Sequence, residues 1–295
     1  MLSPEKVLPI EGASRVLARD DRRLGGILAA EGKLGEADVE RVLRLQQAQG
    51  LRFGEAALRL GLVSAEDLHR AIARQYDFPS PLAGAGAGAE LVVARAPFHP
   101  CAEELRALRT QLQIRWSNAG VSPRLLAIAS PGPGEGRSYL AANLAVAFAQ
   151  LGERTLLVDA DLRAPRQHRI FGLRESAGLS AVLSGRADRG ALLPLADFGP
   201  LSILPAGAVP PNPQELLSRP VLAALLRELR AEFDVILFDT PPARHCADAQ
   251  SVAFRAGHAL VLARRHHTRL ADASAVVREL GDTGARVLGT VCNAF

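Results

Sequence analysis

Lysine is almost absent from this chain of 295 residues, in which Lys6 and Lys33 are the only two. Arginine therefore carries nearly all of the positive charge, and the formal net charge is +4. Aromatic residues make up only 4% of the chain, and no stretch interleaves them with basic residues. A groove for nucleic acid is therefore not expected.

Cysteine is also scarce, and Cys101, Cys246 and Cys292 lie far apart in the sequence. Their odd number and the lack of a C-x-x-C pair argue against both a disulfide framework and a zinc site, so a reducing compartment is expected. No run reaches the roughly 18 to 20 apolar residues of a membrane-spanning helix, and residues 1–23 lack the apolar core of a signal peptide. We therefore predict a cytoplasmic protein that reaches a membrane only through a partner.

An internal repeat occupies the first quarter of the chain. Residues 23–46 read RLGGILAAEGKLGEADVERVLRLQ, and residues 52–75 read RFGEAALRLGLVSAEDLHRAIARQ. Each copy has the pattern of a short helix, a glycine turn and a second helix, with Gly35 and Ser64 at the N-cap of that second helix. Two copies predict a small α-helical tandem-repeat domain over residues 19–79, with a regulatory role.

The composition changes after the repeat. Residues 80–100 contain SPLAGAGAGAE and two further prolines, which predicts a flexible linker at 80–97. From residue 98 to 295, short apolar runs alternate with amphipathic segments, and this pattern predicts an α/β domain whose mainly parallel sheet is covered on both faces. The expected strands are 125–129, 155–159, 201–204, 235–239, 259–263 and 287–292, and the expected helices include 101–117, 138–151, 213–231 and 269–280.

A glycine-rich loop follows the first expected strand. Residues 130–138 read SPGPGEGRS and lead directly into a helix, which is the context that a P-loop requires. Glycines let backbone N–H groups turn towards phosphates, the helix start adds partial positive charge, and Ser138 offers a hydroxyl to Mg²⁺. The expected nucleotide-binding residues here are Gly132, Gly134, Glu135, Gly136, Arg137, Ser138 and Tyr139. The alternative is an ordinary Gly/Pro turn between strand and helix.

Carboxylates end two other expected strands. Asp159 and Asp161 follow the apolar run LLV, and Asp239 follows VILF. A lone aspartate at a strand end is usually a cap or turn residue. Parallel sheets, however, bind ligands at the carboxyl ends of their strands, so three carboxylates beside a glycine-rich loop predict a Mg²⁺–nucleotide site.

These segments resemble a known family. The motifs at 130–138, 156–163 (LLVDADLR) and 236–242 (ILFDTPP), together with 204–207, 210–217, Asp248-Ala249 and 287–293, are similar to bacterial tyrosine autokinases of the EpsG type, which serve polysaccharide chain-length determinants. The resemblance implies a MinD/ParA-related fold that binds ATP and Mg²⁺. It implies catalytic roles for Asp159, Asp161, Asp239 and Arg137, and a metal site at Ser138, Asp159 and Asp239. It places Asn293 beside the adenine, although a cap of the terminal strand is an equal alternative.

The same resemblance extends to assembly and partners. Glu103, Arg106 and Arg109 match the family's EX2RX2R oligomer motif, and on a helix this spacing covers one arc; a solvated charged face is the alternative. The resemblance implies a homo-oligomer, a membrane-embedded polysaccharide chain-length determinant as partner, and a location peripheral to the inner membrane. The implied function is tyrosine kinase activity that regulates exopolysaccharide chain length or export.

Two departures from the family pattern keep other functions open. Position 137 is arginine where most P-loops have lysine, so phosphoryl transfer is expected to be slower. The only tyrosines are Tyr76 and Tyr139, so the usual cluster of acceptor tyrosines is missing. The alternatives are a non-catalytic nucleotide-sensing adaptor and a MinD/ParA-like positioning ATPase. That last group usually has an additional lysine early in the loop, where this chain has Pro-Gly-Pro at 131–133.

The N-terminal repeat resembles a second family, the domain at the start of type II secretion and pilus ATPases, some of which bind cyclic di-GMP. Arg23 and Arg52 could stack on guanine or pair with phosphate, and Gly25 and Gly54 would permit close backbone approach. A protein-docking module, in which these residues only shape the turns, is the alternative.

Overall fold

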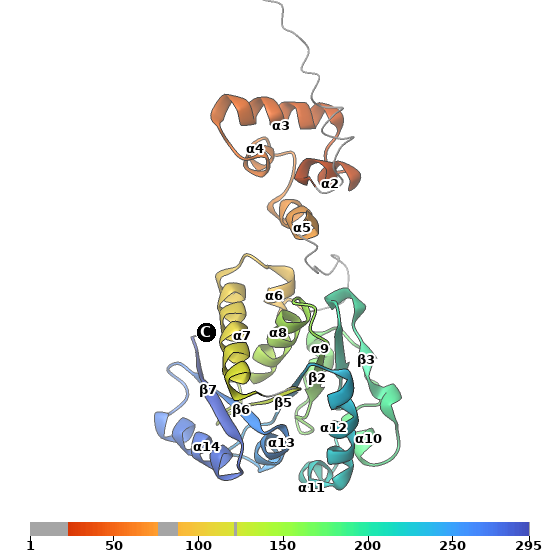
Figure 1. The fold of residues 1–295 in the computed structure, drawn as a ribbon, viewed down its shortest axis with the longest axis vertical. Coiled ribbons are helices and arrows are strands. Elements are labelled where there is room, and N and C mark those ends of the chain that lie inside the picture. Colours follow the sequence, from red (N-terminus) through yellow and green to blue (C-terminus); the bar gives the residue numbers. More distant parts are fainter. Residues whose placement is uncertain (1–22, 76–87, 121–122, 295) are drawn as a thin grey trace, which may run out of the picture. The chain divides into compact units, whose positions relative to one another are not determined.

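The computed structural model describes residues 23–75, 88–120 and 123–294 (Figure 1). The chain divides into two compact units, Met1–Ser80 and Pro81–Phe295. Residues 19–22 and 76–79 of the predicted helical domain, with Tyr76 among them, and residues 80–87 of the predicted linker lie outside the described residues. Within the described residues, no helix is both long enough and apolar enough to cross a membrane.

The helical unit contains the predicted repeat. Each copy has a short helix, a glycine turn and a longer helix, and Gly32 and Gly61 occupy the turns with φ of 68° and 66°. Such positive φ values are unfavourable for residues with a side chain, so glycine at these two positions ends the first helix of each copy. The helices are α2 (Leu24–Ala30), α3 (Glu36–Gln49), α4 (Phe53–Arg59) and α5 (Ala65–Gln75).

The two copies pack against each other through equivalent residues. A Cβ on Gly25 would lie 3.1 Å from the ring of Phe53, and a Cβ on Gly54 would lie 2.8 Å from Leu68 and 3.4 Å from Leu24. Leu24 and Phe53 hold the same place in the two copies, so each copy presents a glycine to the other copy's large side chain. We expected Gly25 and Gly54 to leave space for a ligand next to the backbone. This is wrong for the space in which a Cβ atom would lie, because neighbouring side chains fill it.

A charge cluster holds the second copy to the first. Ser64 caps α5 as predicted: its hydroxyl accepts from the N–H of Asp67 at 3.0 Å, and the Asp67 carboxylate accepts from that hydroxyl at 2.6 Å. Lys33 of the first copy pairs with the same carboxylate at 3.0 Å. The hydrogen bond from Ser64, followed by that from Lys33, lowers the pKa of Asp67 to about 2.

The second unit is built on one sheet with the strand order β3-β4-β2-β5-β1-β6-β7. All neighbouring strands run parallel except β3, which pairs antiparallel with β4 at the edge. This confirms the predicted mainly parallel sheet, although the short edge strand β3 was not predicted. The strands are β1 (Arg124–Ala129), β2 (Thr155–Asp159), β3 (Leu193–Pro194), β4 (Leu201–Leu204), β5 (Val235–Asp239), β6 (His258–Arg264) and β7 (Arg286–Asn293).

Helices cover both faces of this sheet (Figure 1). The helices of one face are α6 (Val92–Arg95), α7 (Pro100–Ala119), α8 (Arg137–Ala149) and α9 (Gln167–Ile170). Those of the other face are α10 (Leu179–Leu183), α11 (Pro213–Ser218), α12 (Pro220–Glu232), α13 (Asp248–Ala256) and α14 (Leu270–Asp282), with the 3₁₀ turn η1 (Arg189–Ala191) beside them. The 3₁₀ turn η2 (Ala196–Phe198) packs on the first face through Phe198. Alternate strand residues supply each core, so Leu125 faces the second set and Leu126 the first.

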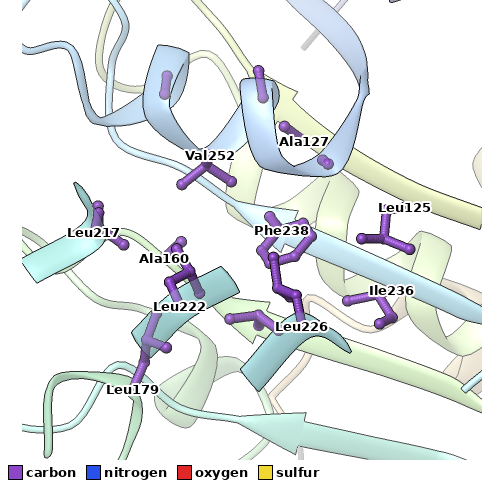
Figure 2. Close-up of a cluster of buried hydrophobic side chains, with 14 of the residues drawn as sticks. Leu125, Ala127, Ala160, Leu179, Leu217, Leu222, Leu226, Ile236, Phe238 and Val252 are labelled. Atoms are coloured by element: carbon purple, nitrogen blue, oxygen red, sulfur yellow. The ribbon is translucent and has the colours of Figure 1, made fainter. Parts of the chain in front are cut away.

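Figure 2 shows the core of the second face. Leu125 on β1 and Ile236 and Phe238 on β5 project towards Leu226 of α12 and Val252 of α13. These side chains are at most 3% exposed, so the sheet is held from this side by continuous apolar contact. The carboxyl ends of the strands, where the site lies, are thereby fixed on a rigid layer.

Two expectations about element boundaries are wrong. Residues 88–97 belong to the second unit rather than to a flexible linker: Leu91 and Val93 are buried, and Asn143 of α8 bonds the N–H of Val93 at 3.1 Å. The single helix expected at 213–231 is broken before Pro220. Proline has no N–H and forces the preceding residue out of the helical region, and Arg219 is accordingly extended (φ −62°, ψ 149°).

Candidate nucleotide and metal site

Three adjacent strands bring the predicted site residues together. β2, β5 and β1 are neighbours in the sheet, and the glycine-rich loop leaves the carboxyl end of β1. Asp159 and Asp239 are register partners at the ends of β2 and β5, while Ile128, next to the end of β1, is also paired with Asp239. The sheet therefore places both carboxylates beside the start of the loop.

The loop has the backbone shape of an anion cradle. Gly134 and Gly136 have φ of 70° and 100°, which only glycine adopts readily, and α8 begins immediately afterwards. The carboxylate of Glu135 is buried and accepts from the N–H of Gly132 at 2.8 Å and from the hydroxyl of Thr268. Glu135 therefore holds the loop in shape with its side chain, while the glycine backbone and the helix start remain the elements suited to phosphate.

Arg137 is bound to the loop itself. Its Nε donates to the carbonyl oxygen of Thr240 at 2.7 Å, and its Nη1 donates to the carbonyl oxygen of Gly132 at 2.7 Å and to the hydroxyl of Ser130. The side chain is only 7% exposed. In this structure the guanidinium therefore ties the loop to the end of β5 through its Nε and Nη1 atoms.

Asp159 and Asp239 each have one oxygen satisfied and one without a partner. Asp159 Oδ2 accepts from the N–H groups of Arg166 at 3.2 Å and Gln167 at 3.0 Å. Asp239 Oδ2 accepts from the side-chain amide of Gln167 at 2.8 Å. The Oδ1 atoms of both residues are buried and have no hydrogen-bond partner in the part of the chain that the structure describes. Two such oxygens on adjacent strands are the ligands that a hard cation needs.

Burial perturbs the titration of both carboxyls. Desolvation raises the pKa of Asp159 well above its usual value, and the negative charges of Asp239 and then Asp161 add to this. Desolvation also raises the pKa of Asp239, to about 6, although hydrogen bonds from Gln167 and the Ser138 hydroxyl oppose the shift. A bound cation would stabilise the charged form of both groups.

The residues present fit Mg²⁺. Ser138, Asp159 and Asp239, the residues expected to hold the metal, carry a hydroxyl and two carboxylates, and no group of three or more His, Cys, Asp or Glu side chains suited to a metal occurs among the described residues. Mg²⁺ is typically held by one or two protein carboxylates together with substrate phosphates and water. A site that is complete only with a nucleotide bound therefore agrees with this ligand set.

Asp161 stabilises the turn that follows β2. It is buried, and its Oδ1 accepts from the N–H groups of Arg163 at 3.2 Å and Ala164 at 2.9 Å, which closes the turn after β2. Arg163 in turn makes a two-pronged ion pair with the fully buried Asp248 at 2.9 and 3.1 Å. The turn that carries Asp161 is thus fixed from both sides.

Gln167 is a site residue that sequence reasoning missed. Its amide nitrogen bridges Asp239 and the carbonyl oxygen of Ser138 at 3.0 Å, and its backbone N–H holds Asp159. Gln167 is completely buried, so this one residue orients Asp159 through its backbone and Asp239 and the start of α8 through its side chain. No motif marks an isolated glutamine, and only the proximity of the three strand ends identifies it.

Tyr139 and Asn293 lie on the wall of a hollow beside the loop. A space of about 420 Å³ between α7, α8 and β7 is lined by these two residues with Gly136, Leu105 and Cys292, among others. The Tyr139 hydroxyl is 3.4 Å from the Cys101 sulfur on α7, so its side chain packs there rather than on the loop. Asn293 donates to the carbonyl oxygen of Glu135 at 2.9 Å and thereby supports the loop.

The charged motif on α7 faces inward more than expected. Arg106 donates to the carbonyl oxygen of Pro97 at 2.6 Å and pairs with Glu103, and Arg109 donates to the carbonyl oxygen of Ala147 on α8 at 2.8 Å. Only Glu103 is fully exposed. The expectation of one exposed arc is therefore wrong for both arginines, because their long side chains bend back to cap carbonyl groups of their own subunit.

A parallel sheet with a P-loop, buried carboxylates on the adjoining strands and a Mg²⁺-type ligand set defines a P-loop nucleotide-binding protein. Residues 122–294 match the family model ParA: NUBPL iron-transfer P-loop NTPase. Tyrosine-protein kinase YwqD of Bacillus subtilis is 36% identical over 191 residues, which cover 65% of this chain and 80% of YwqD. The kinase domain of Escherichia coli tyrosine kinase ETK aligns with a TM-score of 0.65 and 28% identity, covering 69% of this chain and 79% of that domain.

The chain belongs to the bacterial tyrosine-protein kinases with a ParA/MinD-like P-loop domain. Some other relatives are much longer. EpsB of Ralstonia nicotianae is 35% identical over 221 residues, which cover 75% of this chain but only 29% of EpsB. The predicted family and fold class are thereby confirmed.

Proposed function

We propose that this chain is an ATP- and Mg²⁺-dependent protein tyrosine kinase module that regulates the chain length or export of an exopolysaccharide. The observation that carries the proposal is the pair of buried, unpartnered oxygens on Asp159 and Asp239 beside the glycine-rich loop. If these adjacent carboxylates bound no cation, their buried charges would destabilise the fold with nothing to compensate them. Membership of the tyrosine-protein kinase family supports the choice of phosphoryl transfer over other P-loop reactions.

The nucleotide is positioned by the loop and the hollow beside it. Backbone N–H groups between Gly132 and Ser138 cradle the phosphates, and the start of α8 adds its partial positive charge. The base lies in the hollow between α7 and β7, with Asn293 at its edge. Ser138, Asp159 and Asp239 would hold Mg²⁺, which would supply positive charge to offset the negative charge on the transferred phosphoryl group.

Asp161 is the group that receives the acceptor's proton. Asp159 and Asp239 are committed to the metal, whereas Asp161 belongs to a turn that is fixed independently by Arg163 and Ala164. The tyrosine oxygen attacks the γ-phosphorus, the bond from that phosphorus to the bridging oxygen breaks, and its electron pair leaves with ADP. The hydroxyl proton passes to Asp161, so charge and atoms balance.

Oligomer contacts and a membrane partner complete the proposal. Glu103, Arg106 and Arg109 form a subunit interface in which the inward-bound arginines set the shape of α7 and Glu103 is the residue exposed to a neighbour. The partner is the cytoplasmic segment of a membrane-embedded polysaccharide chain-length determinant, which brings the protein to the inner membrane.

The helical tandem repeat serves as a docking module, supported by the use of Gly25 and Gly54 in its own packing.

A second function, nucleotide sensing without catalysis, is favoured by one observation. Arg137 donates hydrogen bonds to three oxygen atoms, two in the loop and one on Thr240. Phosphoryl transfer, by contrast, needs a positively charged side chain in contact with the phosphates. A loop stiffened in this way could bind nucleotide and change its partner's activity without chemistry.

One single-turnover experiment separates these functions. Labelled ATP and Mg²⁺ are mixed with the full chain, a tyrosine peptide, and the partner's cytoplasmic segment present or absent. The kinase proposal predicts label on tyrosine that is lost in Asp161→Asn while ATP still binds. ATP binding with no labelled tyrosine under either condition would establish the sensing function instead.

A further inference from the structure

A second cavity, of about 770 Å³, opens beside the turn that carries Asp161. Its walls come from the stretch after β2, from Arg163 to Arg169, and from the loop after β4, from Pro205 to Val209. None of the predicted nucleotide or metal residues lines it. Asp161 does not line the cavity itself, but its Oδ1 accepts from the backbone N–H groups of Arg163 and Ala164, which do.

Most of the charged residues on the cavity walls are arginines. Arg163, Arg166 and Arg169 line it, and Glu175 is the one acidic residue among the lining residues that the structure describes. Arg163 uses its Nε and Nη2 on Asp248, and Arg166 uses Nη2 on Glu90. Each guanidinium carries five N–H donors, so both keep donors for a further anion. The side chain of Arg169 forms no hydrogen bond or ion pair with any of residues 23–75, 88–120 and 123–294, whereas its backbone is bonded within α9 and the turn after it.

The remaining walls suit an aromatic side chain. Pro165 and Pro205 present flat apolar surfaces, and Val209 is 59% exposed at the rim. An aromatic ring that packs on these surfaces removes apolar area from water, which favours binding. A tyrosine ring also carries a hydroxyl, which needs a hydrogen-bond partner at the end of its pocket. The volume is in the range of sites that enclose several side chains, and it is larger than an isolated phosphate requires.

We propose that this cavity is the acceptor site of the kinase and that it selects an acidic peptide containing tyrosine. The inference rests on the proposed function, since it places the acceptor hydroxyl next to Asp161. The tyrosine ring lies against Pro165 and Pro205, and flanking Asp or Glu side chains pair with Arg169 and with the donors left on Arg163 and Arg166. Tyr139 cannot be this acceptor, because its hydroxyl is held against Cys101 on α7.

The test measures peptide binding and phosphoryl transfer separately on the full chain. The probe is a labelled peptide with one tyrosine flanked by glutamates, and its matched control has glutamines in their place. The variant Arg169→Glu reverses a cavity charge that supports no contact within the described structure. Arg278→Glu makes the same charge change on the exposed face of α14, away from the cavity.

The proposal predicts that the acidic peptide binds at least about tenfold more tightly than the glutamine peptide. Arg169→Glu should abolish this preference, whereas Arg278→Glu should retain it, and both variants should bind Mg·ATP like the wild type. Equal binding of the two peptides, or equal losses in the two variants, would overturn the acceptor site. If the acidic peptide binds selectively but no tyrosine becomes labelled, the cavity assignment stands and the kinase proposal fails.

Discussion

Asp159 and Asp239 lie opposite each other in register where β2 and β5 end, and both are completely buried. Burial raises the pKa of both carboxyls, so their ionised forms lower the stability of the fold at neutral pH. Both carboxyls lie beside the glycine-rich loop, where a bound cation would stabilise their ionised forms and offset this loss of stability.

Removing one of these charges should stabilise the nucleotide-free protein. Because its pKa in the fold is raised to about 6, ionised Asp239 opposes folding at pH 7, and the penalty shrinks as the pH falls from this value towards the ordinary 3.8. Asp239→Asn should therefore increase the free energy of unfolding by about 1 to 3 kcal/mol at pH 7 and by less at pH 5. Urea unfolding without nucleotide measures this, with the exposed Asp282→Asn as control; a loss of stability in Asp239→Asn would contradict the account.

Arg137 should matter for the stability of the loop. Arg137→Ala leaves the buried carbonyl group of Thr240 without its donor, which costs about 1 to 3 kcal/mol, and it removes one of the two donors to the carbonyl group of Gly132. We expect a clear decrease in the free energy of unfolding without nucleotide, and a smaller decrease for Arg137→Lys, whose single ammonium group cannot span both carbonyls. Unchanged unfolding of both variants would show that the guanidinium is not a structural tie.

Asp67 should make the helical unit sensitive to acid. Its pKa is lowered to about 2 in the fold from an ordinary 3.8, so its contribution is present above pH 4 and is lost as the pH falls towards 2. Asp67→Asn should reduce the free energy of unfolding of this unit by about 2 kcal/mol at pH 7, and the difference from the wild type should shrink below pH 4. Helix unfolding followed by hydrogen exchange tests this, and a difference that is independent of pH would refute the ion-pair role.

Cys292 should report on where the base lies. It is exposed and lines the hollow between α7 and β7, so Mg·ATP should slow its reaction with a maleimide by about fivefold or more once the site is saturated. The measurement uses a chain in which Cys101→Ser and Cys246→Ser leave one thiol. A control with Ser274→Cys and Cys292→Ser, placed on the exposed face of α14, should show no protection. Equal rates with and without Mg·ATP at Cys292 would move the base elsewhere.

Much of the fold and the site could be predicted because each signal is local. Strands such as those ending at Asp159 and Asp239 are short, wholly apolar and followed by a carboxylate, and the glycine-rich loop leads into a helix. In a parallel sheet the carboxyl ends of the strands lie at one edge, so the sequence predicts these residues on the same edge. Their direct contact depends in addition on the strand order, which makes β2, β5 and β1 neighbours.

What could not be predicted depends on contacts between distant segments. Gln167 gains its role only because Asp239, 72 positions further along the chain, ends the adjacent strand. The spacing of Arg106 and Arg109 fixes their common arc but not the direction in which their side chains bend. The composition of residues 80–97 suggested a flexible linker, yet Asn143 of α8 provides hydrogen bonds that hold residues 90–93 in the core.

The central claim is that Asp159, Asp239 and the glycine-rich loop form a Mg²⁺-dependent ATP site. Calorimetric titration of ATP into the full chain tests it most directly, in the presence and absence of Mg²⁺, for the wild type, Asp159→Asn and the exposed turn variant Asp188→Asn. We predict that Mg²⁺ strengthens ATP binding at least about tenfold in the wild type and in Asp188→Asn, and that Asp159→Asn loses this gain. An equal effect of Mg²⁺ in all three proteins, or no ATP binding by the wild type, would contradict the account.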